Sequence, residues 1–284
     1  MTAARALVAD ATNRLSKAGV PSPSVDAAEL LAFVLGTTRG RLLLHDQVSD
    51  EDARRFERLV VKRMTRVPLQ HIIGTAAFRW IELEVGPGVF VPRPETELLV
   101  EIAVRHIKQA PEPVVVDLCA GSGAIALAIA NEVSHATVHA VEVSTDAWPW
   151  LQRNAAKSQS ASVHLHHADA THPELLHELD GTVDVVVTNP PYIPDDMVPV
   201  DPEVALHDPR RALFGGPDGL DVVRGLIPIA HRLLKPAGLL VIEHADVQGK
   251  ALPELLISQE WTQVVDHQDL NGRPRATVAT KVQR

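Results

Sequence analysis

The chain has 284 residues, a formal net charge of −9 and 45% hydrophobic side chains. This composition is typical of a globular protein with a large core, and the length favours two domains. The negative net charge and the few aromatic side chains argue against a nucleic-acid-binding protein, because such binding needs a basic surface or aromatic rings that stack on bases. No apolar stretch approaches the roughly 20 residues that span a bilayer, and the N-terminus has no signal-peptide pattern. The single cysteine excludes an intrachain disulfide, and we expect a cytoplasmic protein.

The first 75 residues carry helical signals. Apolar positions at helical spacing predict a helix over residues 2–18, and capping signals predict helices over 24–35 and 49–64, with a short helix at 41–45 between them. Ser24 is the expected cap of the second helix, and Ser49 opens a capping box at the start of the last one. These short helices predict a small N-terminal bundle, residues 1–75, that binds the substrate or packs against the rest.

Residues 76–110 carry both strand and helix signals. Residues 77–85 alternate apolar and polar side chains, which indicates a strand, until a Gly-Pro-Gly run ends it. Pro94 suits the first position of a helix that ends near Lys108. We therefore predict a linker that contains a β-hairpin and a helix.

From residue 111 to residue 284, strand and helix signals alternate. Strands are expected at 114–118, 136–143, 162–168, 183–188, 238–243, 261–268 and 275–282, and helices at 122–132, 146–158, 173–179, 218–234 and 249–257. Repeated βαβ units predict a parallel sheet, and Asn271-Gly272 predicts an antiparallel hairpin at its end. Pro149 should delay or kink its helix, and residues 194–214 are expected to form a loop.

A glycine-rich turn, Asp117 to Gly123, follows the first of these strands. Its glycines let the backbone approach a ligand, and the next helix offers unpaired N–H groups at its N-terminus. Glu142, at the end of the second strand, can accept hydrogen bonds from both hydroxyls of a ribose. Asp169, after the third strand, can accept from an adenine amino group or simply cap a helix. The pattern predicts an adenosine-type cofactor, but it also fits a dinucleotide fingerprint.

The tetrapeptide Asn189-Pro190-Pro191-Tyr192 follows the strand at 183–188. Open α/β sheets bind ligands at this end of their strands. Because the prolines stiffen the turn, the Asn189 carboxamide oxygen and the Pro190 carbonyl form a two-point acceptor for a planar –NH2 group. Two such acceptors orient the lone pair of a weakly nucleophilic nitrogen toward an incoming methyl group. Hydride transfer has no use for this pair, so the tetrapeptide favours S-adenosyl-L-methionine as the cofactor.

Further motifs lie at residues 68–74, 91–97, 117–123, 189–193, 208–213 and 215–220. With these motifs the chain resembles the HemK/PrmC family, the peptide chain release factor glutamine N5-methyltransferases. The resemblance covers nearly the whole chain. It implies a class I, Rossmann-like S-adenosylmethionine-dependent methyltransferase domain at 111–284, with a mostly parallel seven-stranded sheet. It also implies a small N-terminal helical domain.

The same resemblance implies a substrate and a set of site residues. The substrate is the glutamine of a Gly-Gly-Gln tripeptide in a ribosomal release factor, and the enzyme is expected to be a cytoplasmic monomer that contacts no membrane and no nucleic acid directly. Asn189 and the Pro190 carbonyl would hold the glutamine amide, with Pro191 and Tyr192 in the pocket. The cofactor would be bound by Asp117, Cys119, Ala120, Gly121, Ser122, Gly123, Glu142, Asp169, Ala170, Asn189, Arg93 and Thr96.

Some residues depart from the family pattern or suggest other chemistry. Glu243 lies in a stretch that differs from the common Glu-Ile-Gly-like one, so the resemblance gives it no role. Cys119 is expected to be a small residue beneath the cofactor, because no histidine partner suggests a nucleophile. His164 and His166 would share one strand face, but no further ligand spacing supports a metal site.

Three other functions remain open from the residues. An adenine N6-methyltransferase would use the same acceptor pair, but it would need a basic groove. A non-catalytic adenosine-binding factor would not need Asn189. An NAD-dependent oxidoreductase would fit the glycine turn and Glu142 equally well.

Overall fold

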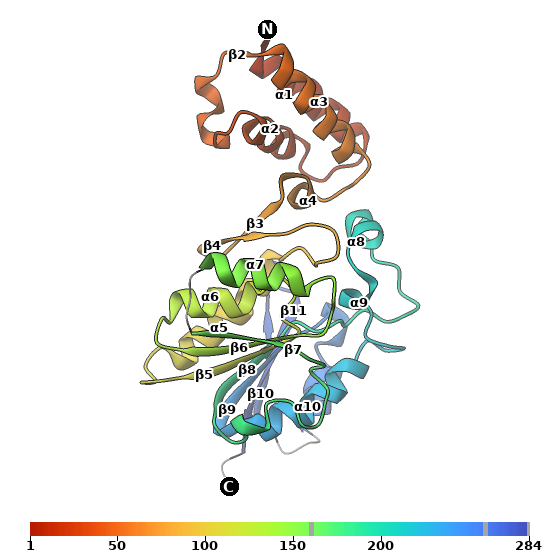
Figure 1. Ribbon diagram of the computed structural model, residues 1–284. Coiled ribbons are helices and arrows are strands. Elements are labelled where there is room, and N and C mark those ends of the chain that lie inside the picture. The colour runs from red at the N-terminus through yellow and green to blue at the C-terminus, as the bar shows by residue number, and fades with distance from the viewer. Residues whose placement is uncertain (159–161, 258–260, 283–284) are drawn as a thin grey trace. The chain divides into compact units, whose positions relative to one another are not determined.

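The computed structural model describes residues 1–158, 162–257 and 261–282, and it consists of two compact units (Figure 1). Unit 1 contains Met1–Thr75 together with Pro199–His207, and unit 2 contains Ala76–Val198 and Asp208–Arg284. The segment 199–207 is thus separated in sequence from the rest of unit 1 but folds with it. Among the described residues, no helix has the length and apolar character required to cross a bilayer.

Unit 1 is a helical bundle with one very short two-stranded sheet. Its elements are β1 (Thr2–Ala3), α1 (Ala4–Lys17), α2 (Pro23–Val34), the 3-10 helix η1 (Arg39–Leu44), β2 (Gln47–Val48), α3 (Asp50–Met64), α4 (Leu69–Ile73) and α8 (Pro202–His207). The core is built from fully buried aliphatic side chains such as Leu15, Leu30 and Val60. Leu15 is one of the apolar positions whose spacing predicted the first helix.

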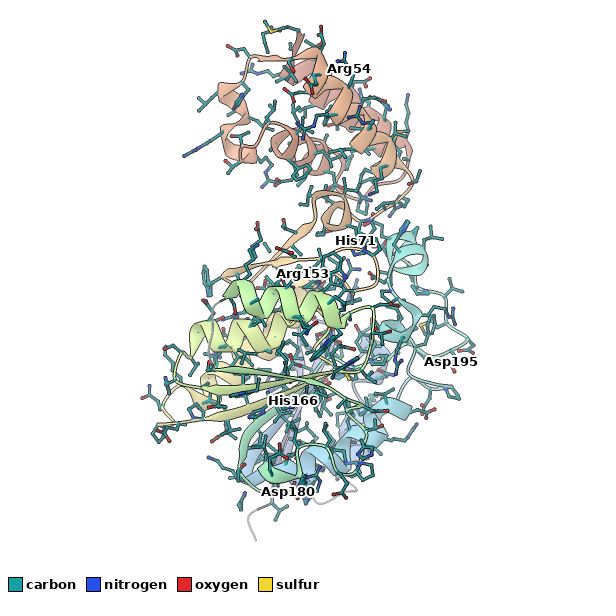
Figure 2. All side chains as sticks on the ribbon, viewed as in Figure 1. Arg54, His71, Arg153, His166, Asp180 and Asp195 are labelled. Atoms are coloured by element: carbon teal, nitrogen blue, oxygen red, sulfur yellow. The ribbon has the colours of Figure 1, made fainter. Side chains whose placement is uncertain are left out.

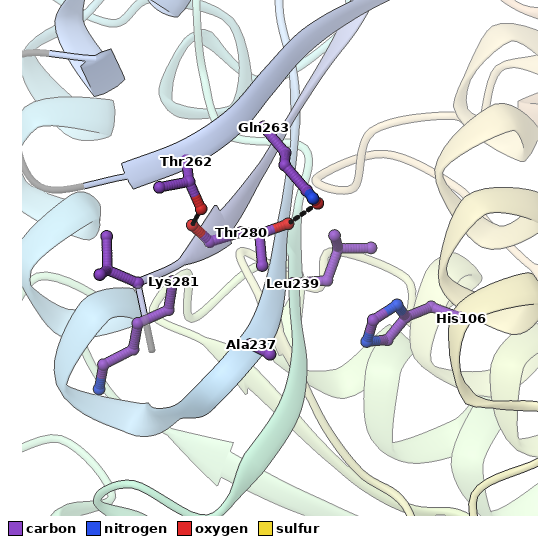
Figure 3. A pocket seen from close by; sticks show the side chains of 8 residues that line it. His106, Ala237, Leu239, Thr262, Gln263, Thr280 and Lys281 are labelled. Atoms are coloured by element: carbon purple, nitrogen blue, oxygen red, sulfur yellow. Dashed lines mark hydrogen bonds between the residues drawn. The ribbon is translucent and has the colours of Figure 1, made fainter. Parts of the chain in front are cut away.

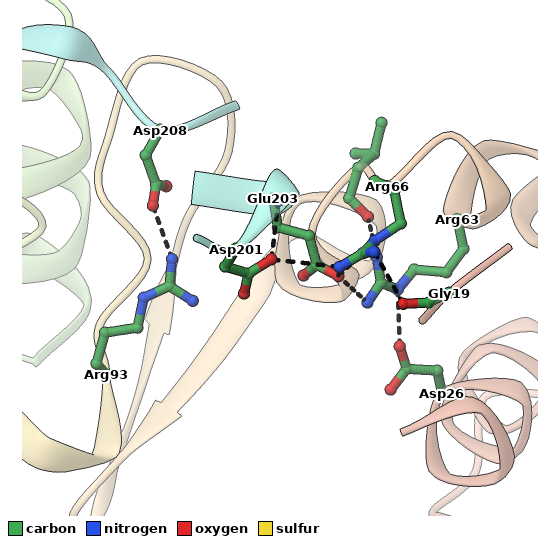
Figure 4. Close-up of polar contacts among 9 residues, drawn as sticks. Gly19, Asp26, Arg63, Arg66, Arg93, Asp201, Glu203 and Asp208 are labelled. Atoms are coloured by element: carbon green, nitrogen blue, oxygen red, sulfur yellow. Dashed lines mark hydrogen bonds and ion pairs between the residues drawn. The ribbon is translucent and has the colours of Figure 1, made fainter. Parts of the chain in front are cut away.

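A buried ionic network ties α8 to α2 and α3 (Figure 4). Arg63 Nε donates to Asp26 Oδ2 at 2.7 Å, and Arg63 Nη2 donates to Glu203 Oε1 at 2.5 Å. The Arg63 side chain is 3% exposed. Burial raises the pKa of Asp26 and the Arg63 guanidinium opposes that rise. A guanidinium that bridges two carboxylates satisfies charges that would otherwise be costly to bury.

Unit 2 contains the seven-stranded sheet. Its elements are β3 (Thr75–Phe78), β4 (Ile81–Glu84), η2 (Pro94–Thr96), α5 (Glu97–Ile107), β5 (Val114–Leu118), α6 (Ala124–Glu132), β6 (Thr137–Glu142), α7 (Trp148–Ser158), β7 (Val163–His167), η3 (His177–Leu179), β8 (Val183–Thr188), α9 (Arg210–Leu213), α10 (Asp221–Leu233), β9 (Leu234–Glu243), η4 (Asp246–Gln248), α11 (Ala251–Ile257), β10 (Trp261–Gln268) and β11 (Pro274–Lys281). The strand order is β10-β11-β9-β8-β5-β6-β7. Strands β9, β8, β5, β6 and β7 pair in parallel. Strand β11 pairs antiparallel with both of its neighbours, β9 and β10. This sheet confirms the predicted α/β, Rossmann-like fold.

Helices cover both faces of the sheet (Figure 1). Successive strand residues point to opposite faces, so Val115 packs with α5 and α6 while Val116 packs with α10 and α11. Both residues are fully buried. This arrangement explains why these strands read as continuous apolar runs.

The structure corrects several expectations about local elements. Helix α2 begins at Pro23 with Ser22 at the cap position, so Ser24 does not cap it. Residues 77–85 are two strands with a turn at Arg79, where φ is +47°, and not one strand. The expected loop 194–214 contains α8 and α9, and the expected helix at 173–179 is only the 3-10 helix η3. Short elements of this kind are held by tertiary contacts, which local propensity does not encode.

Other local expectations are confirmed. The Ser49 hydroxyl accepts the backbone N–H of Asp52 at 3.0 Å, as a helix cap does. Helix α7 begins at Trp148, directly before Pro149, which is the late start that the proline predicted. The hairpin between β10 and β11 forms where Asn271-Gly272 predicted it, with Gly272 at φ +76°.

The Arg63 network predicts a local loss of stability. Arg63→Ala leaves the buried Asp26 without its cation and Glu203 paired with Arg66 alone, so we expect a loss of about 3–5 kcal/mol in unit 1. Urea unfolding followed by circular dichroism should show this loss. Tryptophan fluorescence should not, since all four tryptophans lie in unit 2.

Arg55→Ala is the matched control on the same helix. Arg55 pairs with Asp52 at 3.5 Å and its side chain is 49% exposed, so its loss should cost less than about 1 kcal/mol. Equal effects of the two variants would contradict the role assigned to the buried network.

Candidate active site

The predicted site residues meet at one edge of the sheet in unit 2. The parallel strands β5, β6, β8 and β9 end there. The glycine turn follows β5, Glu142 ends β6, Asn189 follows β8 and Glu243 ends β9. This edge is where open parallel sheets hold ligands.

The backbone of the glycine turn is left-handed at three positions, a conformation that glycine adopts more readily than residues with a side chain. Cys119, Gly121 and Gly123 all have positive φ, at +67°, +57° and +87°. A Cβ on Gly123 would lie 2.8 Å from Cδ1 of Leu151, whereas a Cβ on Gly121 would meet nothing within 4 Å. Gly123 is therefore required for packing as well as for its φ, and the space beside Gly121 is open to a ligand.

Cys119 is a free thiol in this turn. Burial raises its pKa, and the nearby Glu142 carboxylate raises it further. The thiolate is thus strongly disfavoured, which agrees with the expectation that Cys119 is no nucleophile.

Asp117 is fully buried at the end of β5. Its Oδ2 accepts the backbone N–H of Ala126 at 3.0 Å, which anchors the start of α6. Burial holds the pKa of Asp117 well above its usual range. Oδ1 has no hydrogen-bond partner within the described part of the chain, so it is a candidate acceptor for a ligand.

Glu142 joins the end of β6 to the glycine turn. Its Oε2 accepts the N–H of Gly121 at 2.7 Å, and its Oε1 accepts the N–H of Ser144 at 2.6 Å. The residue is 7% exposed. Each oxygen keeps a second lone pair, so the carboxylate is held in place and can still accept from a ribose hydroxyl.

Asp169 and Ala170 follow β7. Asp169 Oδ1 accepts both the N–H and the hydroxyl of Thr171, at 2.8 and 2.7 Å. These hydrogen bonds lower the pKa of Asp169. The turn therefore holds a charged carboxylate after β7 and buries Ala170 beside it. The contact with adenine stays a prediction.

The Asn189 carboxamide is oriented by a residue from the linker. Asn189 Nδ2 donates to Thr96 Oγ1 at 3.2 Å, and Thr96, the last residue of η2, is 4% exposed. Because Nδ2 is engaged, Oδ1 is left to accept from another group. Thr96 was predicted only as a cofactor residue, and no sequence signal indicates its contact with Asn189, because 93 residues separate the pair.

Tyr192 is anchored at both of its ends. Its hydroxyl donates to Glu243 Oε1 at 3.2 Å, and its carbonyl accepts from Gln248 Nε2 at 3.0 Å. A Cβ on Gly215 or Gly219 would overlap the carbonyl oxygen of Pro191 or Tyr192, respectively. The glycines at 215–220 thus let the chain pack directly against the Asn-Pro-Pro-Tyr turn, which explains this motif physically.

Arg93 lies beside the same turn but contacts other groups. Its Nη2 donates to Asp208 Oδ2 at 2.7 Å (Figure 4), and its guanidinium lies 5.1 Å from the centre of the Phe90 ring. Arg93 therefore fastens the segment after Val198 where it re-enters unit 2. Its predicted contact with the cofactor stays a prediction.

Two other features lie outside this site. His139 Nδ1 and His166 Nε2 lie 3.0 Å apart; His166 is labelled in Figure 2. The pKa of His139 is lowered to about 4, first by burial and then by His166 and His164. A cavity of about 420 Å³ (Figure 3) is lined by residues that include His106, Ala237 and Gln263. Ala237 is near the start of β9, at the opposite end from Glu243, so this cavity is not the predicted site.

Comparison with known proteins gives the family. Residues 6–74 match the model of the PrmC N-terminal domain, and residues 82–201 match the methyltransferase small domain. A release factor glutamine methyltransferase of Streptomyces coelicolor is 52% identical over 278 residues, which cover 96% of each chain. Proteins of the same name in Mycolicibacterium smegmatis and Mycobacterium tuberculosis are 48% and 45% identical. They cover 100% and 94% of this chain, and the matches span 100% and 88% of those proteins. Identity of this extent over the full length shows that the chain belongs to the family of the release factor glutamine methyltransferases, enzymes that use S-adenosyl-L-methionine.

Proposed function

We propose that this protein transfers a methyl group from S-adenosyl-L-methionine to the side-chain amide nitrogen, N5, of the glutamine in the Gly-Gly-Gln motif of peptide chain release factors. The observation that carries this proposal is the orientation of Asn189. Its Nδ2 is engaged by Thr96, so its Oδ1 is available beside the rigid Pro190 carbonyl. Together they form a two-point acceptor for a primary amide.

The chemistry of an amide nitrogen explains why two acceptors are needed. The lone pair is conjugated with the carbonyl, so the nitrogen attacks poorly unless it is held in line with the methyl group. Fixing both N–H bonds on Asn189 Oδ1 and the Pro190 carbonyl supplies that alignment, and such positioning can contribute on the order of 7 kcal/mol. The new N–C bond forms as the S–C bond breaks, and the nitrogen then loses one proton to solvent.

The residues of the glycine turn fit the cofactor. S-adenosyl-L-methionine supplies an electrophilic methyl group on a sulfonium. The open space beside Gly121 admits a ligand close to the backbone, and Asp117 Oδ1 is an acceptor that still lacks a partner in the described chain. Glu142 is held so that its carboxylate can accept from ribose hydroxyls. We assign Cys119, Ala120, Ser122, Asp169 and Ala170 to the same cofactor site.

The roles of the domains and the class of substrate are proposed from the family match and from the net charge. Unit 1 contains the PrmC N-terminal domain match, and we assign residues 1–75 to docking of the release factor, 76–110 to a linker and 111–284 to catalysis. The net charge of −9 favours a protein substrate over nucleic acid. We propose that the enzyme acts as a monomer in the cytoplasm.

Methyl transfer from labelled cofactor tests the substrate directly. Label should appear in a purified release factor and not in its variant with the motif glutamine changed to alanine. An adenine N6-methyltransferase would use the same Asn-Pro-Pro-Tyr turn, so DNA and RNA form a third arm. Equal label in the alanine variant, or label in nucleic acid alone, would overturn the assignment.

Removing the Asn189 acceptor should slow turnover far more than it weakens cofactor binding. For Asn189→Ala we expect kcat to fall by on the order of 10²–10³, as when one oriented polar group is removed from an active site. Calorimetry should show that the Kd for the cofactor changes much less than kcat. The control is Asn271→Ala, an exposed asparagine of the β10–β11 hairpin, which should behave as the wild type. Unchanged turnover in Asn189→Ala would instead favour the non-catalytic alternative.

Glu142 should govern cofactor affinity. Glu142→Gln keeps the shape but replaces a charged acceptor, and hydrogen bonds to charged groups contribute about 1.5–3 kcal/mol. We expect the Kd for S-adenosyl-L-methionine to rise by at least about tenfold. Glu174→Gln, at an exposed position in the same unit, is the control. Equal affinities of the two variants would count against the ribose contact.

A further inference from the structure

Glu243 is a buried carboxylate at the active-site edge that the proposed reaction does not use. It ends β9 and is 2% exposed. Its Oε1 accepts the Tyr192 hydroxyl at 3.2 Å. Its Oε2 has no partner at regular hydrogen-bond geometry among the described residues, although the Thr96 hydroxyl is close enough to lower the pKa of Glu243 by hydrogen bonding. A buried carboxylate is costly, so its presence here requires an explanation.

Thr96 lies next to both Asn189 and Glu243. Thr96 Oγ1 accepts from Asn189 Nδ2 at 3.2 Å, and the Thr96 side chain lowers the pKa of Glu243. A hydroxyl has one hydrogen, and because the oxygen faces the Asn189 donor, that hydrogen is free to point elsewhere. Glu243 is a neighbouring acceptor that is able to take it.

We propose that Glu243 is a positioning residue that, as a carboxylate, fixes the orientation of the Asn189 carboxamide through Thr96 and holds Tyr192 in place. This inference rests on the proposed glutamine methylation and deepens it. A carboxylate only accepts hydrogen bonds. It therefore forces both hydroxyls to donate toward it, and it leaves the Thr96 oxygen to accept from Asn189.

Binding of the substrate amide depends on whether Oδ1 or Nδ2 of Asn189 faces it. With Nδ2 on Thr96, Oδ1 faces the substrate amide and can accept its N–H. If a donor replaced the carboxylate, Thr96 would accept from that donor and turn its own hydrogen toward Asn189. The carboxamide would then turn over and present Nδ2 to the N–H bonds of the substrate. Two donors cannot pair, and the acceptor pair would be lost.

The charge state of Glu243 controls this orientation. The pKa of Glu243 is raised to about 7: burial raises it most and Glu95 adds to the rise, whereas Thr96, Arg275 and Tyr192 oppose it. Below that pH the carboxyl group is protonated and can donate. Above it, both oxygens accept. Turnover should therefore rise with pH through a midpoint near 7 and level off above it.

Glu243→Gln tests the proposal because glutamine has the same shape and carries a donor. We expect kcat to fall by on the order of tenfold to 10²-fold, with the Kd for S-adenosyl-L-methionine unchanged and the rise in kcat near pH 7 abolished. Glu243→Asp keeps an acceptor-only group and should restore part of kcat and the pH dependence. Thr96→Val should lower kcat as Glu243→Gln does, and Thr96→Ser should retain it. The double variant Thr96→Val/Glu243→Gln should be no slower than the worse single variant.

Thermal stability separates positioning from a structural role. The pKa of Glu243 is raised on folding from 4.5 to about 7, so the native state binds the proton more tightly than the unfolded state, and stability is lost as the pH rises between these two values. The Tm of Glu243→Gln relative to wild type should therefore increase from pH 5 to pH 8, while kcat falls. A variant that loses Tm at both pH values together with cofactor binding would indicate a structural role only and overturn the proposal.

The two proposals fail in different ways. If the wild-type enzyme does not label the motif glutamine, the proposed function is wrong. If the wild type labels it and Glu243→Gln has the wild-type kcat and pH profile, the function stands and the role of Glu243 is wrong.

Discussion

The register of the parallel strands is the constraint on which the site depends. Leu118 pairs with Thr188, and Thr188 pairs with Ile242, so β5, β8 and β9 reach the edge of the sheet together. The residues that follow them, including Asn189 and Glu243, therefore emerge side by side. A shift of one residue in β8 would turn every side chain of that strand to the other face, and the carboxamide would leave the site.

This edge concentrates carboxylates in the interior of the protein. Asp117, Glu142 and Glu243 are 0%, 7% and 2% exposed. The two whose pKa is raised, Asp117 and Glu243, owe that shift first to burial. Each carboxylate accepts from a backbone N–H or a hydroxyl, which reduces the cost of burial without removing it. Proteins retain such costly groups mainly where chemistry requires them, and the position of all three at the ends of β5, β6 and β9 agrees with that view.

Much of the fold could be predicted because its signals are local. The β-branched run 183–188 and the two prolines after it determine a buried strand and its end, and β8 has those bounds. The seven strands and most of their helices were predicted to within a few residues; the exceptions are β9, which begins at Leu234, and the expected helix at 173–179, of which only the 3-10 helix η3 forms. The short helices α8 and α9 were missed because they depend on distant partners, as Glu203 does on Arg63.

Part of the site could be predicted from local motifs, whereas its contacts between segments far apart in the sequence could not. The motifs at 68–74 and 91–97 indicated the family, and the relatives confirm it, together with the enzyme class and the cofactor. The contacts of Asn189 with Thr96 and of Tyr192 with Glu243 join segments 93 and 51 residues apart. No spacing rule relates such segments, because only the folded chain brings them together.

The sequence by itself therefore determined most of the strands and helices, the repeated βαβ units of a parallel sheet and the types of residue at the strand ends. Apolar periodicity, proline and glycine act within a few residues of the chain, so these features can be read without a structure. The tertiary structure alone decided which hydroxyls and carboxylates meet, and hence which way the Asn189 carboxamide faces. That orientation depends on Thr96, which accepts from Asn189 Nδ2, and only the folded chain brings Thr96 and Asn189 together.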